Sequence, residues 1–225
     1  MYCYFKSMCE VVTLFFHMLL DYMRLMRGVW ILSQLEAPII SIFGGSKIGQ
    51  DHPYAKNAKN IAKGLLDQGY SVITGGGPGI MEAANCTVFR QRGHASQVKS
   101  IGIEVEGLGQ GINVCADIFI QTRYFFTRKF LLTRYSQGFV VFPGGYGTAD
   151  ELFEIVTLMQ TSKLQRFPIV LIGTAYWKSL LAWVENARSE ALLLDEDANM
   201  LFVTDDLKEA IEHIKNRCQS HLAHQ

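Results

Sequence analysis

The chain has 225 residues, which is enough for one sizeable domain with an appendage rather than two full domains. Lysine plus arginine number 21, and aspartate plus glutamate also number 21, so the formal net charge is zero. This balance argues against a general attraction to nucleic acid or to an anionic membrane, and any anion site must be local.

The N-terminal segment contains the apolar run 11–20, which has the character of a signal peptide or a membrane span. Glu10 and His17 interrupt it, little positive charge precedes it, and no small-residue cleavage site follows it. Asp21 and Arg24 end the run before the roughly 20 apolar residues that a bilayer requires. We therefore expect neither a targeting signal nor contact with a membrane.

An amphipathic helix from about Met8 to Leu35 explains this segment better. Large apolar residues recur at three- and four-residue spacing along it, which is the pattern of one helix face. They are Val12, Phe15, Phe16, Leu19, Met23 and Met26. Such a face needs a partner surface, either on the domain or on a second subunit.

From Pro38 onward, short β-rich runs alternate with helical ones. Expected strands lie at 39–43, 70–74, 100–105, 117–122, 138–142, 168–172 and 200–203. Expected helices lie at 53–68, before 93, at 125–135, up to about 163, around Trp177 and Trp183, and at 205–217. A glycine-rich loop separates the third and fourth strands.

The strands are apolar throughout rather than alternating, which indicates burial on both faces in a parallel sheet. Alternating strands and helices of this kind form an α/β fold, a doubly wound parallel sheet with helices on both faces. We divide the chain into an N-terminal helical extension at 1–37, this domain at 38–217 and a C-terminal tail at 218–225. Ligands of such folds bind beyond the carboxyl ends of the strands.

The five cysteines are odd in number and scattered, and they form no CxxC pair or His-containing cluster with metal-ligand spacing. This usage is typical of reduced thiols, so we expect a cytoplasmic protein without a metal ion or other cofactor.

Three strand-to-helix turns are rich in glycine: 43–49, 74–81 and 143–151. Glycine lets backbone approach a ligand closely, and a helix N-terminus beyond it offers unpaired N–H groups to an anion. The turns lack the spacing of dinucleotide and P-loop motifs. Residues Gly144 to Thr148 are therefore expected to bind phosphate, the alternative being a tight turn alone. Thr148 suits either a helix cap or a phosphate contact.

Charged residues flank the third turn in the sequence or in the expected fold. Asp150 and Glu151 suit the positive end of a helix dipole, but an acid beside phosphate also suggests a contact with sugar hydroxyls. Arg128 and Lys129 follow a strand end, where their charge can offset a phosphate and orient a carboxylate. The alternative is that they are cations on an amphipathic helix.

Together these residues resemble the LONELY GUY (LOG) family of cytokinin riboside 5′-monophosphate phosphoribohydrolases, also called lysine decarboxylase-like. The family pattern PGGxGTxxE is complete in the stretch 143–151, and the family's upstream Arg-Lys pair matches Arg128 and Lys129. Its GGGxxGxM turn matches 75–81 with one residue fewer between the glycines. The resemblance covers about Ile39 to Lys215.

The resemblance implies a Rossmann-like homodimer that hydrolyses a nucleoside 5′-monophosphate to free base and ribose 5-phosphate. Arg128 and Glu151 would be catalytic. The substrate-binding residues would be Lys129, Gly144, Gly145, Tyr146, Gly147, Thr148, Asp150, Gly76 and Gly77. The chain has Phe125, Phe126 and Thr127 where short plant-type members have Met-His-Glu, and so resembles the longer bacterial branch.

Several alternatives remain at this point. A non-catalytic nucleotide carrier or sensor shares the fold and the glycine-rich turns. A single-stranded nucleic-acid binder is disfavoured by the zero net charge. Decarboxylation would require a Schiff-base lysine with partners for a pyridine ring, and no constellation places one. The group that protonates the leaving base is open among Glu82, Glu104 and Glu106.

Overall fold

The computed structural model describes residues 2–93, 97–108 and 114–222. A seven-stranded sheet in the order β4-β3-β2-β1-β5-β6-β7 forms its centre, and every pairing in it is parallel. The strands are β1 (Ile39–Phe43), β2 (Ser71–Thr74), β3 (Ser100–Val105), β4 (Ile118–Thr122), β5 (Ser136–Val141), β6 (Ile169–Ile172) and β7 (Leu201–Thr204). The predicted doubly wound, Rossmann-like sheet is confirmed.

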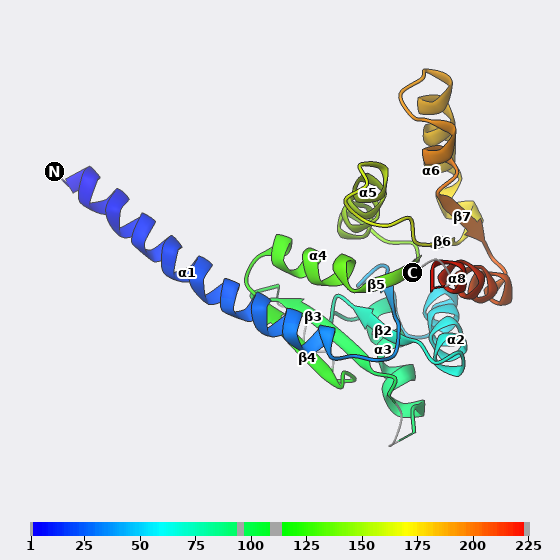
Figure 1. Ribbon diagram of the computed structural model, residues 1–225, viewed down its shortest axis with the longest axis horizontal. Helices are drawn as coiled ribbons and strands as arrows, with labels where there is room; N and C mark the ends of the chain where they lie inside the picture. Colours follow the sequence, from blue (N-terminus) through cyan, green and yellow to red (C-terminus); the bar gives the residue numbers. More distant parts are fainter. Residues whose placement is uncertain (1, 94–96, 109–113, 223–225) are drawn as a thin grey trace.

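The described residues form eight helices, arranged on both faces of the sheet (Figure 1). They are α1 (Tyr2–Ser33), α2 (Pro53–Asp67), α3 (Ile80–Gln91), α4 (Phe125–Arg134), α5 (Tyr146–Gln160), α6 (Thr174–Ser189), α7 (Asp195–Ala198) and α8 (Leu207–Leu222). One apolar core joins α2, α3 and α8 to the sheet, and a second joins the inner end of α1 with α4, α5 and α6 to the opposite face. The short α7 was not predicted.

The burial of the strands explains their composition. All residues of β1, β2 and β6 are buried, because helices cover both faces of the central sheet. The edge strand β4 alternates in burial instead. In α2, Pro53 occupies the first turn and the ring of His52 accepts a hydrogen bond from the Tyr54 N–H.

The strand order places a topological switch between β1 and β5. The chain builds β1 to β4 toward one edge and then returns to add β5, β6 and β7 on the other side of β1. The turns that follow β1 and β5 therefore diverge from adjacent strand ends, which is where open α/β sheets bind ligands.

Helix α1 extends far beyond the body of the molecule (Figure 1). Its inner residues Leu25, Val29 and Leu32 pack on the second core. The predicted apolar face does not pack on the domain: Phe15 is 61% exposed, and the other five members are also exposed. No helix among the described residues combines the length and the apolar character that crossing a membrane requires.

The cysteines differ from the expectation of reduced thiols, because Cys86 of α3 and Cys115 form a disulfide. They are 29 residues apart, so only the fold reveals that they are neighbours. Cys9 and Cys218 are free. The cytoplasmic assignment thus loses the support that it took from the cysteines and stays a prediction.

The domain division also stays a prediction. Helix α8 continues to Leu222, so the expected tail at 218–225 begins inside this helix, and residues 223–225 lie outside the described residues. The glycine-rich loop expected between β3 and β4 likewise falls partly outside them, at 109–113.

Candidate active site

A cavity of about 580 Å³ opens at the carboxyl ends of β1 and β5. Its volume is in the range of small-molecule sites. The turn after β1, the first turn of α5 and side chains from α3 and α4 line it. The lining residues are Gly44, Gly45, Ser46, Lys47, Ile48, Met81, Leu108, Phe125, Arg128, Gly144, Gly145, Tyr146, Gly147, Thr148 and Glu151.

The three glycine-rich turns contact one another at this edge of the sheet. The Gly45 N–H donates to the Pro143 carbonyl at 3.0 Å, and the Ile80 N–H donates to the Gly45 carbonyl at 3.3 Å. Gly79 has a φ of +74°, and a Cβ there would lie 2.4 Å from the Gly45 oxygen. Only glycine fits that position without a backbone shift.

The N-terminus of α5 faces the cavity without a side-chain cap. Gly145 is the N-cap residue, and no side chain bonds to this helix end. The first N–H groups of a helix have no partner inside it, so they are available to an anion. Thr148 is therefore inside the first turn, and its predicted role as a cap is wrong because the helix begins two residues earlier, at Tyr146.

The glycines of this turn divide into two kinds. A Cβ at Gly144 would lie 2.1 Å from Thr148 Oγ1, so the packing of the turn itself requires glycine there. Added Cβ atoms at Gly145 and Gly147 would meet no heavy atom within 4 Å. Neither φ nor a protein contact explains these two glycines, whereas close approach of a ligand to the backbone does.

Arg128 of α4 and Glu151 of α5 form a buried ion pair through Nη2 and Oε1. Their exposed fractions are 9% and 8%. The Arg128 guanidinium lies over the phenyl ring of Phe125, with its Cζ 5.5 Å from the ring centroid. On another side the guanidinium lies beside Gly75, where an added Cβ would be 3.5 Å from Cζ. Arg128 Nε is buried and has no hydrogen-bond partner among the described residues. A buried donor without a partner is unusual and is consistent with a ligand contact.

The surroundings of Glu151 favour its neutral form. Burial raises the pKa of this carboxyl above its ordinary value of 4.5, and the attraction of Arg128 only partly opposes the effect. Among the described residues, Glu151 supplies the one carboxylate that lines the cavity. A carboxyl with a raised pKa beside a charge partner in a cavity is a candidate for catalysis.

Lys129 and Asp150 lie beside the cavity rather than among its lining residues. Lys129 Nζ forms ion pairs with Asp150 at 2.7 Å and with Glu154 at 3.1 Å. Burial alone would lower the pKa of Lys129, but the two carboxylates outweigh it and the pKa is raised. The ion pairs thus join Lys129 to α5. Neither Lys129 nor Asp150 lines the cavity, so their predicted contact with substrate stays a prediction.

Gly76 and Gly77 also lie outside the lining of the cavity. Gly76 has a φ of +70° and packs near the backbone of Ile103, so the turn after β2 explains this glycine. The predicted contact of both glycines with substrate stays a prediction.

Sequence reasoning missed Ser46 and Lys47, which line the cavity from the turn after β1. Lys47 is its second lining cation, beside Arg128. The signal was present, because the stretch 43–49 follows a strand and is rich in glycine. Phe125 and Met81 were seen as part of motifs, but nothing in the sequence assigns them to the cavity.

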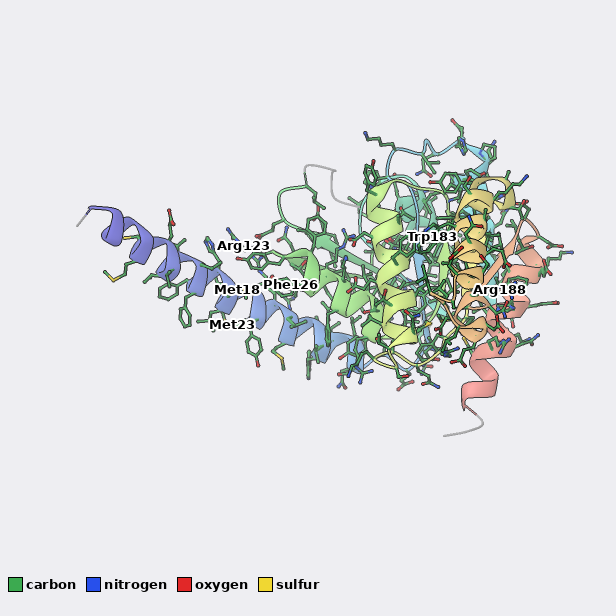
Figure 2. All side chains as sticks on the ribbon, turned by 90° about the horizontal axis from the view of Figure 1, so that it is seen from above. Met18, Met23, Arg123, Phe126, Trp183 and Arg188 are labelled. Carbon is green, nitrogen blue, oxygen red and sulfur yellow. A yellow bond between two sulfur atoms is a disulfide. The ribbon has the colours of Figure 1, made fainter. Side chains whose placement is uncertain are left out.

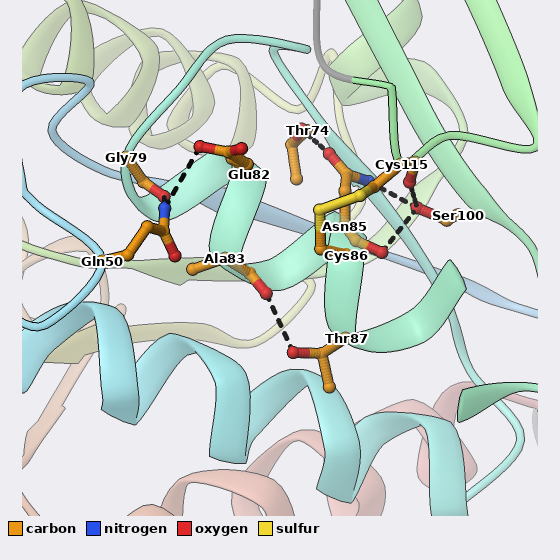
Figure 3. The surroundings of a disulfide bond; sticks show 10 residues. All are labelled: Gln50, Thr74, Gly79, Glu82, Ala83, Asn85, Cys86, Thr87, Ser100 and Cys115. Atoms are coloured by element: carbon orange, nitrogen blue, oxygen red, sulfur yellow. Dashed lines mark hydrogen bonds between the residues drawn. A yellow bond between two sulfur atoms is a disulfide. The ribbon is translucent and has the colours of Figure 1, made fainter. Parts of the chain in front are cut away.

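The three acids considered for the leaving base do not line this cavity. Glu82 lies next to Gln50, whose amide donates to it at 3.3 Å near the disulfide (Figure 3), and both line a separate cavity of about 430 Å³. Glu106 pairs with Arg24 at 2.8 Å, which lowers its pKa. Glu104 lies on β3.

No group of three or more His, Cys, Asp or Glu side chains is placed to hold a metal ion within 2–93, 97–108 and 114–222.

Comparison with known sequences identifies relatives along most of the chain. The family described as "Possible lysine decarboxylase" matches residues 72–214, which is more than half of the chain. A probable cytokinin riboside 5′-monophosphate phosphoribohydrolase of Oryza sativa subsp. japonica is 29% identical over 68% of this chain and 62% of its own length. A cytokinin riboside 5′-monophosphate phosphoribohydrolase of Arabidopsis thaliana is 26% identical over 81% of this chain and 84% of its own.

Solved structures share the fold. A molybdenum cofactor binding protein of Rippkaea orientalis has a TM-score of 0.60 at 22% identity and covers 81% of this chain and 98% of its own. A Moco carrier protein of Chlamydomonas reinhardtii has a TM-score of 0.59 at 22% identity, covering 82% and 99%. At these identities the likeness shows the architecture alone.

Proposed function

Since the chain belongs to the LOG family, whose members carry the description "Possible lysine decarboxylase", we propose that it is a nucleoside 5′-monophosphate phosphoribohydrolase. The substrates are AMP, a cytokinin riboside monophosphate or both, and the products are the free base and ribose 5-phosphate. The observation that carries the proposal is the buried Arg128–Glu151 pair beside the uncapped N-terminus of α5 in one cavity.

The phosphate binds at the first turn of α5. The N–H groups there point to an anion and the helix dipole favours negative charge. The open space at Gly145 and Gly147 lets phosphate oxygens reach the backbone. Lys47 and Arg128 line the same cavity and neutralise the phosphate charge. Binding energy from this remote group orients the sugar for attack.

Glu151 acts on the ribose. Cleavage of an N-glycosidic bond passes through an oxocarbenium-like sugar, as in glycoside hydrolysis, and a nearby carboxylate stabilises the developing positive charge. Glu151 follows Thr148 by about one helical turn, so it lies deeper than the phosphate along the same helix. Arg128 holds the carboxylate in place.

The bond changes balance with water as the second reactant. The bond between C1′ and the base nitrogen breaks, and the water oxygen bonds to C1′. Glu151 orients this water and takes one proton from it, and the base leaves with a proton. Because Glu82, Glu104 and Glu106 lie outside the lining of the cavity, the base proton comes from Glu151 after attack or from solvent.

Lys129 and Asp150 contribute indirectly in this proposal. Their ion pair ties α4 to α5 and so fixes the two helices that carry the catalytic residues. Asp150 is 57% exposed at the side chain and remains within reach of a ribose hydroxyl if the pair opens. Gly76 and Gly77 belong to the turn after β2, and their contact with substrate is part of this proposal.

The test is turnover of nucleoside monophosphates by the purified protein. Incubation with AMP and with N6-isopentenyl adenosine monophosphate should release free base and ribose 5-phosphate, measured by chromatography. Glu151→Gln and Arg128→Ala should each lower kcat by about 10²–10⁴-fold. Wild-type turnover in both folded variants would show that the assignment is wrong.

Tight binding of AMP without product would instead support a non-catalytic nucleotide carrier. We also propose that the protein is cytoplasmic and forms a homodimer through α1.

A further inference from the structure

Asp21 is buried on a helix whose neighbouring side chains are exposed. Its exposed fraction is 2%, whereas Leu20 and Tyr22 on either side are 49% and 57% exposed. A buried carboxylate is costly unless hydrogen bonds satisfy its oxygens, so its partners explain why the position is acidic.

Both oxygens of Asp21 accept hydrogen bonds, one from the segment just before α4 and one from a side chain in its first turn. Oδ1 accepts from the Arg123 N–H at 2.6 Å, and Oδ2 accepts from the hydroxyl of Thr127. No side chain at the N-cap residue Tyr124 bonds to this helix end. Asp21 lies 102 residues from Arg123 in sequence, and its carboxylate joins the residue two before α4 to the hydroxyl of Thr127 in the first turn, beside a helix end whose dipole favours negative charge.

The turn that Thr127 joins to Asp21 also carries Arg128. Thr127 is 1% exposed and directly precedes Arg128, and Phe125 in the same turn lies under the guanidinium. We propose that Asp21 is a positioning residue for the reaction: it fixes the first turn of α4 so that Arg128 meets Glu151 and the substrate. The proposal rests on the function proposed above, and it makes α1 part of the catalytic scaffold rather than an appendage.

A second contact between α1 and this region is available as a matched control. Arg24, one turn beyond Asp21, pairs with Glu106 at 2.8 Å, and Arg123 lies 3.8 Å from the same carboxylate. The Arg24 and Glu106 side chains are 37% and 32% exposed. Ion pairs at such exposed positions contribute little, so loss of Arg24 tests α1 contacts in general without removing either hydrogen bond of Asp21.

The pH dependence of activity separates positioning from mere stability. The charged groups that act on Glu151 are Arg128 and Lys129 on α4 and the adjacent Asp150 on α5. Lys47 lines the same cavity. Of these, the attraction of Arg128 does most to lower the pKa of Glu151 against the effect of burial. If Arg128 moves away, that pKa rises further and the acidic limb of the pH–rate profile moves to higher pH.

The experiment compares Asp21→Ala, Asp21→Asn and Arg24→Ala for AMP hydrolysis. Misplacement of a catalytic group by about 1 Å can cost 10²-fold, so Asp21→Ala should lower kcat by about 10- to 100-fold with the acidic limb shifted upward. The Asn side chain of Asp21→Asn can still accept a hydrogen bond from the Arg123 N–H, so its kcat should lie between those of Asp21→Ala and wild type. Arg24→Ala should stay within about 2-fold of wild type.

Thr127→Val provides a second variant of nearly the same shape, in case Asp21→Ala does not fold. It removes the hydroxyl that donates to Asp21, and it should lower kcat by a smaller factor than Asp21→Ala does. Wild-type kcat and an unmoved acidic limb in the folded Asp21 and Thr127 variants would overturn the proposal.

Amide hydrogen exchange of Arg123 and of the first turn of α4 gives a reading without turnover. Faster exchange in Asp21→Ala, but not in Arg24→Ala, supports the positioning role of Asp21, and unchanged exchange overturns it. If wild type does not hydrolyse any nucleoside monophosphate, the proposed function fails, and exchange alone then decides whether Asp21 orders α4.

Discussion

The candidate site and the outer half of α1 depart from ordinary burial in opposite directions. At the site, the charged side chains of Arg128 and Glu151 are buried. On α1, large apolar side chains such as Phe15, Met18 and Met23 stand in solvent, as Figure 2 shows for the two labelled methionines. Soluble domains usually bury the apolar groups and expose the charged ones.

Buried charges and exposed apolar side chains both require a partner group or surface, and the two regions differ in where that partner lies. The buried charges have theirs within the chain, since each neutralises the other. The exposed apolar side chains of α1 have none among the described residues of this chain. Large exposed apolar patches mark interaction sites, and aromatic side chains of about 150–250 Å² each dominate such interfaces. We therefore expect chemistry at the first region and assembly at the second.

Breaking the buried pair should have the largest effect on stability. Arg128→Met leaves Glu151 buried without its partner, and we expect a loss of about 3–5 kcal/mol in the free energy of unfolding. The double variant Arg128→Met with Glu151→Leu should regain most of this loss, because it leaves no buried charge. Urea denaturation at neutral pH measures both values.

The exposed pair of Arg188 with Glu185 on α6 is the control for this experiment (Figure 2 labels Arg188). Arg188→Met should leave the free energy of unfolding nearly unchanged, since solvent screens the pair. A double variant no more stable than Arg128→Met alone would show that the pair itself, rather than an unpaired charge, supplies the stability.

The exposed region of α1 should control association. We expect wild type to sediment as a homodimer, and Phe15→Asp to weaken the dimer by about 10²- to 10⁴-fold, because both copies lose a buried side chain that contributes about 1.5–3 kcal/mol. Analytical ultracentrifugation over a concentration series measures the change. Leu192→Asp is the matched control, since Leu192 is 74% exposed but lies outside α1. Equal sedimentation of wild type and Phe15→Asp would contradict an α1 interface.

The same two regions show what sequence could and could not predict. Periodicity and apolar runs located all seven strands, because burial on both faces leaves a plain signature in β1 or β6. The family resemblance, rather than periodicity, indicated Arg128 and Glu151, and the fold brings these two side chains together as an ion pair. The position of Lys47 in the cavity depends on three turns that meet only in the folded sheet.

Long-range pairing explains the remaining failures. Nothing local in the sequence links Asp21 to Thr127 or Cys86 to Cys115, because sequence separation hides such contacts. The length of α1 was predicted approximately, but its apolar face gave no sign of whether the partner surface belonged to this chain.

The smallest expected effect is the pH dependence of stability and activity, which should arise from Glu151 at the site and not from α1. Burial raises the pKa of Glu151 above 4.5, so between that value and the raised pKa the folded state holds a proton that the unfolded state has lost. Stability contributed by this group is complete below about 4.5 and is lost as pH rises through the folded pKa. Activity that requires the carboxylate should rise through the same window, so stability and activity change in opposite directions.

Urea midpoints and kcat/KM, measured from about pH 4 to about pH 8, test this opposition. Glu151→Gln should remove the share of the fall in stability that this carboxyl contributes. Phe15→Asp should leave both pH dependences, that of stability and that of activity, unchanged, because α1 carries the apolar surface and not the titrating Glu151. An acidic limb of activity at or below 4.5 would show that Arg128 outweighs burial. The Arg128–Glu151 pair would then be an ordinary ion pair, and the case for a catalytic carboxyl would rest on geometry alone.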